Sequence, residues 1–149
     1  MDPISKAREL YASLPWDIRY VPVQMENVIA NLSNISICYT DTGAEDGYTV
    51  KYKNKYRIFV DSNTHPMRLR FTLAHELGHI LLGHITSHQK KPDPWQEYEA
   101  NAFASELLMP EKVVCKYQKY PMDFITKFFY VSESAMRMRL KTIQSGNEP

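Results

Sequence analysis

The sequence feature that most restricts this chain is the run from Phe71 to His84, which reads FTLAHELGHILLGH. It contains the pattern HExxH, in which His75 and His79 are four residues apart and Glu76 follows the first histidine. On an α-helix, residues four apart lie one above the other, so the two imidazoles converge while Glu76 is offset by about 100°. Two neutral imidazoles supply half of a tetrahedral Zn²⁺ shell, and the offset glutamate can act as general base on a water molecule. The pattern therefore predicts two metal ligands and a catalytic base.

The residues around the motif favour a buried helix over a chance occurrence of a short pattern. Apolar residues surround the histidines, so the helix is apolar nearly all round, as expected for a central helix of the core. Two buried histidines with a glutamate beside the first would leave polar groups unpaired unless something polar binds them. We therefore interpret His75 and His79 as Zn²⁺ ligands and Glu76 as the base.

Length and composition indicate one domain without a membrane segment. The chain has 149 residues, 44% of them hydrophobic, which suits a single cored domain over residues 1–149 that includes the C-terminal helices at about 111–143. The formal net charge is +1, so the chain lacks the excess of basic residues that is typical of a nucleic-acid binder. The first residues do not read as a secretory signal, and no apolar run reaches the length of a membrane span. We therefore expect a cytoplasmic protein.

Hydrophobic periodicity predicts an α+β fold in which a small antiparallel sheet packs on the central HExxH helix. An amphipathic helix is expected first, at residues 4–14. Three runs rich in β-branched and aromatic residues then predict strands at 35–39, 48–52 and 56–60, the last of them outermost. After the motif, a polar stretch with prolines predicts a loop. The helices expected beyond it cover residues 95–108, 111–119, 122–130 and 133–143.

A third metal ligand is required because catalytic zinc normally takes three protein ligands and a water molecule. The two cysteines, Cys38 and Cys115, lack CxxC spacing, so a carboxylate is expected instead. The helix at 95–108 carries Glu97 and Glu99, which are separated by about 200° around its axis and cannot both face the metal. Both faces of this helix contain apolar residues, so the pattern leaves the choice between the two glutamates open.

Several other polar residues are candidates for roles near the site. By helical angle His84 lies on the far side of the helix from His75, so we expect a structural or surface role for it. The oxyanion that forms when water attacks a peptide carbonyl needs a hydrogen-bond donor. Tyr98, Tyr130 and His88 are candidates for that role, and nothing in the sequence selects among them.

Three segments of the chain together resemble the ImmA/IrrE family of metallo-endopeptidases. They are RLRFTLAHELGHILLGH (residues 68–84), EYEANAFASELLMP (97–110) and VSESAMRMRL (131–140). The resemblance covers about residues 56–142. It implies a zincin-like fold, a zinc ion bound by the HExxH histidines and by a glutamate of the second helix, and cleavage of helix-turn-helix repressors encoded on phages or mobile elements.

Carried onto this sequence, the family's glutamate ligand is best matched by Glu99, which directly precedes Ala100 and Asn101. The resemblance thus predicts a cytoplasmic zinc metallo-endopeptidase with ligands His75, His79 and Glu99, and with Glu76 as the proton carrier. The rival hypothesis is an antirepressor that binds its partner without cleavage. A structural zinc site is closed by four protein ligands, so a fourth ligand from His84 or His88 would favour the rival.

The C-terminal pair of helices also admits a DNA-binding interpretation. A helix-turn-helix would place Arg137, Arg139 and Lys141 on its recognition helix. Packing is the better interpretation, because Met136 and Ile143 share one apolar face and the basic excess is far below that of a DNA reader. We expect a protein substrate, and no direct contact with nucleic acid or membrane.

Overall fold

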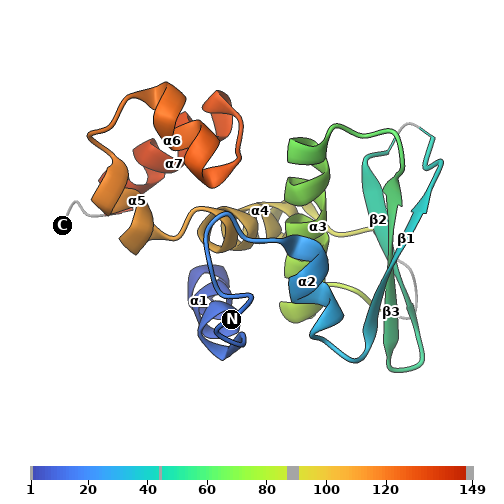
Figure 1. The fold of residues 1–149 in the computed structure, drawn as a ribbon. Helices are drawn as coiled ribbons and strands as arrows, with labels where there is room; N and C mark the ends of the chain where they lie inside the picture. The colour runs from blue at the N-terminus through green and yellow to red at the C-terminus, as the bar shows by residue number, and fades with distance from the viewer. Residues whose placement is uncertain (1, 44, 87–90, 147–149) are drawn as a thin grey trace.

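The computed structural model describes residues 2–43, 45–86 and 91–146, and in these it shows seven helices and three strands (Figure 1). In chain order they are α1 (Pro3–Ser13), α2 (Met25–Ala30), β1 (Ile35–Thr40), β2 (Gly47–Tyr52), β3 (Lys55–Asp61), α3 (Pro66–Leu81), α4 (Pro94–Leu108), α5 (Glu111–Tyr117), α6 (Met122–Phe129) and α7 (Glu133–Gly146). The α+β class expected from the sequence is confirmed. Within the described ranges, no helix has both the length and the apolar character needed to cross a membrane.

The three strands form a mixed sheet with the order β1-β3-β2, so the expectation of an antiparallel sheet with the third strand outermost is wrong. Strand β3 pairs antiparallel with β2 through a tight hairpin, and parallel with β1, with Ile37 opposite Ile58. Strands β1 and β2 therefore do not pair with each other, and β3 lies between them. The central place suits β3, because its Ile58 and Val60 are fully buried.

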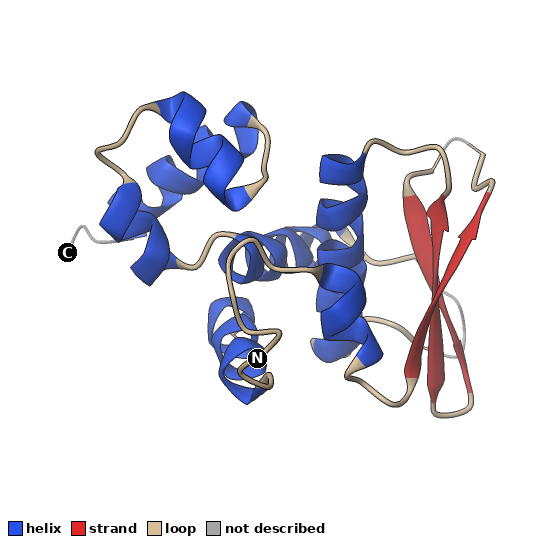
Figure 2. Cartoon of the chain, viewed as in Figure 1, coloured by secondary structure: helices blue, strands red, loops and turns tan. Residues whose placement is uncertain are grey.

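All the helices lie on one side of this sheet (Figure 2). Along β3, buried Ile58 and Val60 alternate with Arg57 and Phe59, which are turned the other way. The two buried residues belong to the same apolar core as Leu73 and Leu77 of α3. One face of the sheet is thus packed and the other is open, as is usual for sheets with antiparallel pairs.

Helix α3 is central because it contacts the sheet on one side and α4 on the other (Figure 1). Its contact with α4 depends on Gly78, where an added Cβ would lie only 2.9 Å from Cδ1 of Phe103. The missing side chain lets the ring of Phe103 pack directly on the backbone of the motif helix. This close approach brings the side chains of α4 within reach of the HExxH histidines.

The three C-terminal helices build a second apolar cluster around Phe129 and Met136. Met136 and Ile143 are buried in it, which confirms the packing interpretation of α7. Arg139, one of the three cations of the DNA-binding interpretation, is only 4% exposed and donates to the Glu106 carboxylate of α4 at 2.7 Å. A side chain held this way does not reach DNA.

Candidate metal centre

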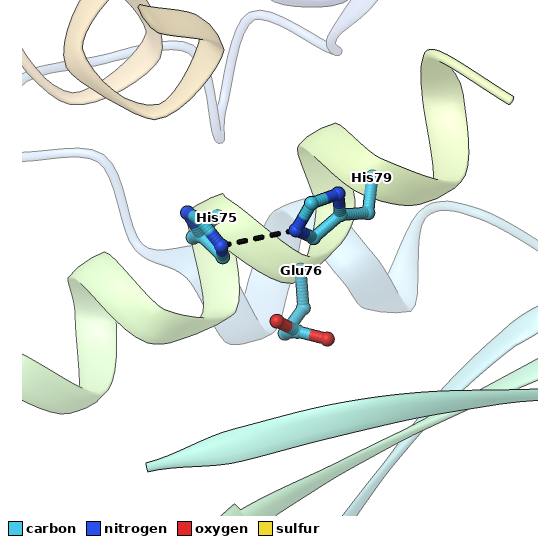
Figure 3. Close-up of side chains that lie close together, drawn as sticks. All are labelled: His75, Glu76 and His79. Atoms are coloured by element: carbon cyan, nitrogen blue, oxygen red, sulfur yellow. Dashed lines mark hydrogen bonds between the residues drawn. The ribbon is translucent and has the colours of Figure 1, made fainter. Parts of the chain in front are cut away.

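The two motif histidines point to the same place from one side of α3 (Figure 3). His75 and His79 are one turn apart, and their Nε2 atoms lie 3.0 Å from each other. His79 is 1% exposed and His75 is partly exposed, so the site lies at the edge of the core. Ligand atoms of His75, Glu76 and His79 all lie within 4.8 Å of one another, and this group could hold a metal ion.

The carboxylate that meets the histidines belongs to Glu97, and not to the expected Glu99. One oxygen of Glu97 lies 3.0 Å from His75 Nε2, and the other lies 3.0 Å from His79 Nε2. Glu99 is turned to the other edge of α4, where it contacts His84 at 3.0 Å. The reason is the 200° between the two glutamates, because α3 faces the edge of α4 that carries Glu97.

The arrangement of these atoms fits a zinc ion. Bonds of about 2.0–2.1 Å to nitrogen and oxygen at a tetrahedral angle place neighbouring ligand atoms about 3.3 Å apart. The Nε2 of His75 lies 3.0 Å from the Nε2 of His79, and each of these nitrogens lies 3.0 Å from one oxygen of Glu97. Asn101, one turn after Glu97, places its Oδ1 2.7 Å from His75 Nδ1, so this ring nitrogen donates its proton there. In the neutral imidazole the Nε2 of His75 is then an acceptor that faces a carboxylate, and a cation bound between them would relieve that repulsion.

Burial gives His79 the protonation state that metal binding needs. The loss of solvent, and next the neighbouring His75, lower the pKa of His79 to about 4. The imidazole is therefore neutral at physiological pH and offers a lone pair. A metal ligand must be deprotonated in this way.

Glu76 lies beside the ligand atoms and points towards the sheet (Figure 3). Its Oε1 accepts a hydrogen bond of 2.6 Å from the Thr49 hydroxyl of β2. Burial raises the pKa of Glu76, an effect that the Thr49 hydrogen bond partly offsets. A carboxylate that is held in one orientation and has a raised pKa is a better proton acceptor near neutral pH, as a general base requires.

His84 lies beside His79 and not on the far side of the helix. Helix α3 ends at Leu81, and Gly83 adopts a left-handed φ of +78° that turns the chain back. The N–H of His84 donates to the His79 carbonyl at 2.8 Å, and the N–H of Gly83 donates to that of Ile80 at 3.1 Å, which is a Schellman motif. The imidazole of His84 is buried, with its Nδ1 2.9 Å from His79 Nδ1. The helical angle predicted the wrong position for His84, because α3 has already ended at Leu81.

A cleft of about 740 Å³ opens over these residues, a volume typical of ligand sites. Strand β2 forms one wall, and residues of α3 and α4 form the other. Neither Tyr98 nor Tyr130 lines this cleft. Tyr98 is exposed and stacks on Trp95, and Tyr130 lies under the Arg70 guanidinium. His88, the third oxyanion candidate, lies outside the described residues, so that role stays unassigned.

Two residues of the site, Thr49 and Asn101, were not singled out from the sequence. Asn101 had a usable signal, because a residue four after Glu97 shares its helix face and can reach the same histidine pair. Thr49 carried no such signal in the sequence, because its contact with Glu76 joins β2 to α3 across 27 residues of sequence.

Sequence comparison relates the chain to a peptidase family. The family model described as the IrrE N-terminal-like domain matches residues 30–141. The chain is 35% identical over 82 residues to uncharacterized immunity region protein 2 of Bacillus phage phi105, covering 48% of each protein. It is 31% identical over 99 residues to the radiation response metalloprotease IrrE of Deinococcus radiodurans, covering 60% of this chain and 30% of IrrE. The chain thus spans less than half the length of either relative.

A solved structure supports the arrangement of the elements. A transcriptional regulator of Mycobacterium tuberculosis matches with a TM-score of 0.66 and 16% identity, over 93% of this chain and 46% of that one. At this identity the likeness concerns the fold alone.

Proposed function

Because the chain belongs to the IrrE N-terminal-like domain family of peptidases, we propose that it is a zinc-dependent endopeptidase that cleaves a helix-turn-helix transcriptional repressor. The observation that carries the proposal is the triangle formed by His75 Nε2, His79 Nε2 and the Glu97 carboxylate, with Glu76 beside it. Cleavage of the repressor would relieve repression of a phage or mobile element. The reaction would take place in the cytoplasm, where such repressors act.

We assign the zinc ligands to His75, His79 and Glu97, with Glu97 in place of the expected Glu99. A zinc ion at this position would act as a Lewis acid that polarises the scissile carbonyl and acidifies the attacking water. Three protein ligands leave a coordination position open, which is typical of catalytic zinc. His84 faces Nδ1 of His79, on the side of the ring away from Nε2, and so does not close the shell.

Glu76 carries the proton in this reaction. Its carboxylate takes the proton from the attacking water and delivers it to the leaving amine nitrogen, as general base and then general acid. The Thr49 hydrogen bond fixes one oxygen of Glu76, which leaves the second oxygen for the proton. Burial raises the pKa of the carboxyl, which favours both halves of the transfer.

The wall of the cleft suits an extended polypeptide. Strand β2 pairs with β3 on one side and is an edge of the described sheet on the other. Residues 47–50 of β2 line the cleft opposite the histidines. An extended peptide can add to such an edge through main-chain hydrogen bonds, which would hold its carbonyl over the metal. This geometry supports cleavage within a chain.

The similarity to an immunity region protein of a phage and to a radiation response metalloprotease supports this class of reaction and partner. The alternative, an antirepressor that acts by binding alone, requires no open metal position and no catalytic base. The contacts among His75, His79 and Glu97, with Glu76 beside them, support the enzyme.

The first test is Glu76→Gln, which keeps the size of the side chain and removes the base. Zinc content should stay at about one ion per chain, while cleavage should fall by about 10²- to 10⁴-fold. The measurement is co-expression with the repressor gene nearest to this gene, followed by an immunoblot for two repressor fragments and a promoter reporter. If Glu76→Gln derepresses the promoter as well as the wild type does, binding suffices and the enzyme proposal is rejected.

The second test assigns the third ligand by comparing Glu97→Ala with Glu99→Ala. Glu97→Ala should lose zinc to a chelator, because two histidines alone hold the ion weakly. Glu99→Ala should still bind zinc, because its carboxylate lies on the other edge of α4. Metal analysis after dialysis against the chelator measures both. The reverse order of zinc loss would make Glu99 the ligand, as the resemblance had implied.

A further inference from the structure

A chain of polar groups continues from the ligand His79, away from the metal centre, through His84 to Glu99, and the proposed reaction uses neither His84 nor Glu99. His79 Nδ1 lies 2.9 Å from His84 Nδ1, and His84 Nε2 lies 3.0 Å from an oxygen of Glu99. His84 is 7% exposed, and the Glu99 side chain is 17% exposed. The three residues come from α3, from the turn that follows it, and from α4.

The proton positions along this chain follow from its last member. An ionised carboxylate only accepts hydrogen bonds, so Glu99 requires that Nε2 of His84 carries a proton. In a neutral imidazole the other nitrogen is then an acceptor, so His84 Nδ1 receives the proton of His79 Nδ1. His79 is left with an unprotonated Nε2, which is the atom that faces His75 and Glu97.

We propose that Glu99 and His84 are positioning residues that hold His79 in the tautomer and ring orientation needed for metal binding. The inference rests on the proposed function for the identity of the site. Asn101 does the same for His75, because its Oδ1 accepts from His75 Nδ1 at 2.7 Å. The Nδ1 of each histidine ligand thus has its own hydrogen-bond acceptor on the side of the ring away from the metal position. Carboxylate and carbonyl partners of this kind orient metal-binding histidines and raise their basicity.

This role explains why both glutamates of α4 serve one site from opposite edges. Glu97 reaches Nε2 of both histidines directly, whereas Glu99 acts on His79 from the opposite side of its ring, through His84. The backbone supports the second path, because the left-handed Gly83 directs His84 back under His79.

The first measurement is zinc affinity by competition with a chelator. Glu99→Ala should weaken zinc binding by about 10- to 100-fold, the usual effect of losing such a partner, and should not abolish it. The control is Leu107→Ala, which removes a buried side chain from the same helix, eight residues after Glu99, and lowers stability. If Leu107→Ala weakens zinc binding as much as Glu99→Ala does, the effect is structural and the inference is rejected.

The second measurement reads the tautomer directly in the metal-free protein. Long-range ¹H–¹⁵N correlation spectra distinguish a protonated Nδ1 from a protonated Nε2 of each imidazole. Wild type should show His79 protonated at Nδ1 and His84 at Nε2, and Glu99→Ala should populate the other tautomer of both. A wild-type spectrum with His79 protonated at Nε2 overturns the inference.

A double-variant comparison tests whether the two residues act through one path. His84→Phe keeps a ring and removes both nitrogens, so it should weaken zinc binding about as much as Glu99→Ala does. The double variant should be no weaker than His84→Phe alone, because Glu99 acts through His84. Additive losses would show two independent effects and reject the path.

Failure of this inference and failure of the proposed function give different results. Zinc-loaded wild type that fails to cleave a repressor rejects the proposed function alone, whereas unchanged zinc affinity in Glu99→Ala rejects this inference alone.

Discussion

The protonation state of the His79 imidazole links this site to the stability of the protein. Burial lowers the pKa of His79 to about 4 in the folded chain, against 6.5 ordinarily. The unfolded chain therefore binds an extra proton between these two values. The contribution of His79 to stability is complete above pH 6.5 and is lost as the pH falls towards 4. The largest loss that this shift allows is about 3 kcal/mol.

The corresponding prediction concerns metal-free protein unfolded with urea at pH 7.5 and at pH 4.5. Wild type should be less stable at the lower pH, and His79→Gln should show a smaller difference because it lacks the titrating group. Subtracting the two variants removes the part that Glu76 contributes, whose raised pKa acts in the opposite direction. Equal pH dependence in the two proteins would contradict the shift.

At the scale of elements, the site depends on how closely α3 and α4 approach each other. Gly78→Ala would place a methyl group 2.9 Å from Cδ1 of Phe103, although alanine is the better helix former. We expect a loss of about 1–3 kcal/mol in unfolding free energy, as for other overpacked cores, and weaker zinc binding because Glu97 moves with α4. Thermal unfolding and chelator competition measure the two effects.

The control for Gly78→Ala is a second substitution at the same contact. Phe103→Leu on its own should destabilise the protein by leaving a cavity, but it makes room for the new methyl group. The double variant should therefore lose less than the sum of the two single losses. Strict additivity would show that Gly78 and Phe103 do not limit the helix contact.

At the scale of the whole molecule, buried arginines connect the C-terminal helices to the rest. Arg139 of α7 donates to the Met109 carbonyl at 3.0 Å and to the Glu106 carboxylate at 2.7 Å. Arg139→Met would leave the buried Glu106 with a weaker partner, the half-exposed Arg8, and should cost about 3 kcal/mol or more. The matched control is Arg137→Met on the same helix, whose exposed pair with Glu133 should contribute less than about 0.5 kcal/mol.

Urea unfolding of these two variants also addresses the number of domains. A single domain over residues 1–149 stays a prediction, and it requires one cooperative transition in the wild type. Because Arg139 joins the two apolar clusters, Arg139→Met should shift the whole transition. A separate early transition of the C-terminal helices would indicate two folding units.

Local features of the sequence determined the centre of the site. The HExxH spacing places His75, Glu76 and His79 within little more than one turn of one helix, so helical geometry alone brings their side chains together. The α+β class, the strand positions and the described helices other than α2 followed from periodicity for the same reason, because each is a property of neighbouring residues. The family resemblance was also available from three short segments, and the family model confirms it.

Contacts between elements decided the rest. Glu97 and Glu99 flank the buried stripe of α4 on opposite edges, so the apolar pattern of the sequence does not separate them, and only the position of α3 turns Glu97 to the histidines. The place of β3 between β1 and β2 and the return of His84 beneath His79 likewise depend on how segments pack after they form. The periodicity of a helix or strand specifies which residues share a face, and the tertiary structure decides what that face meets.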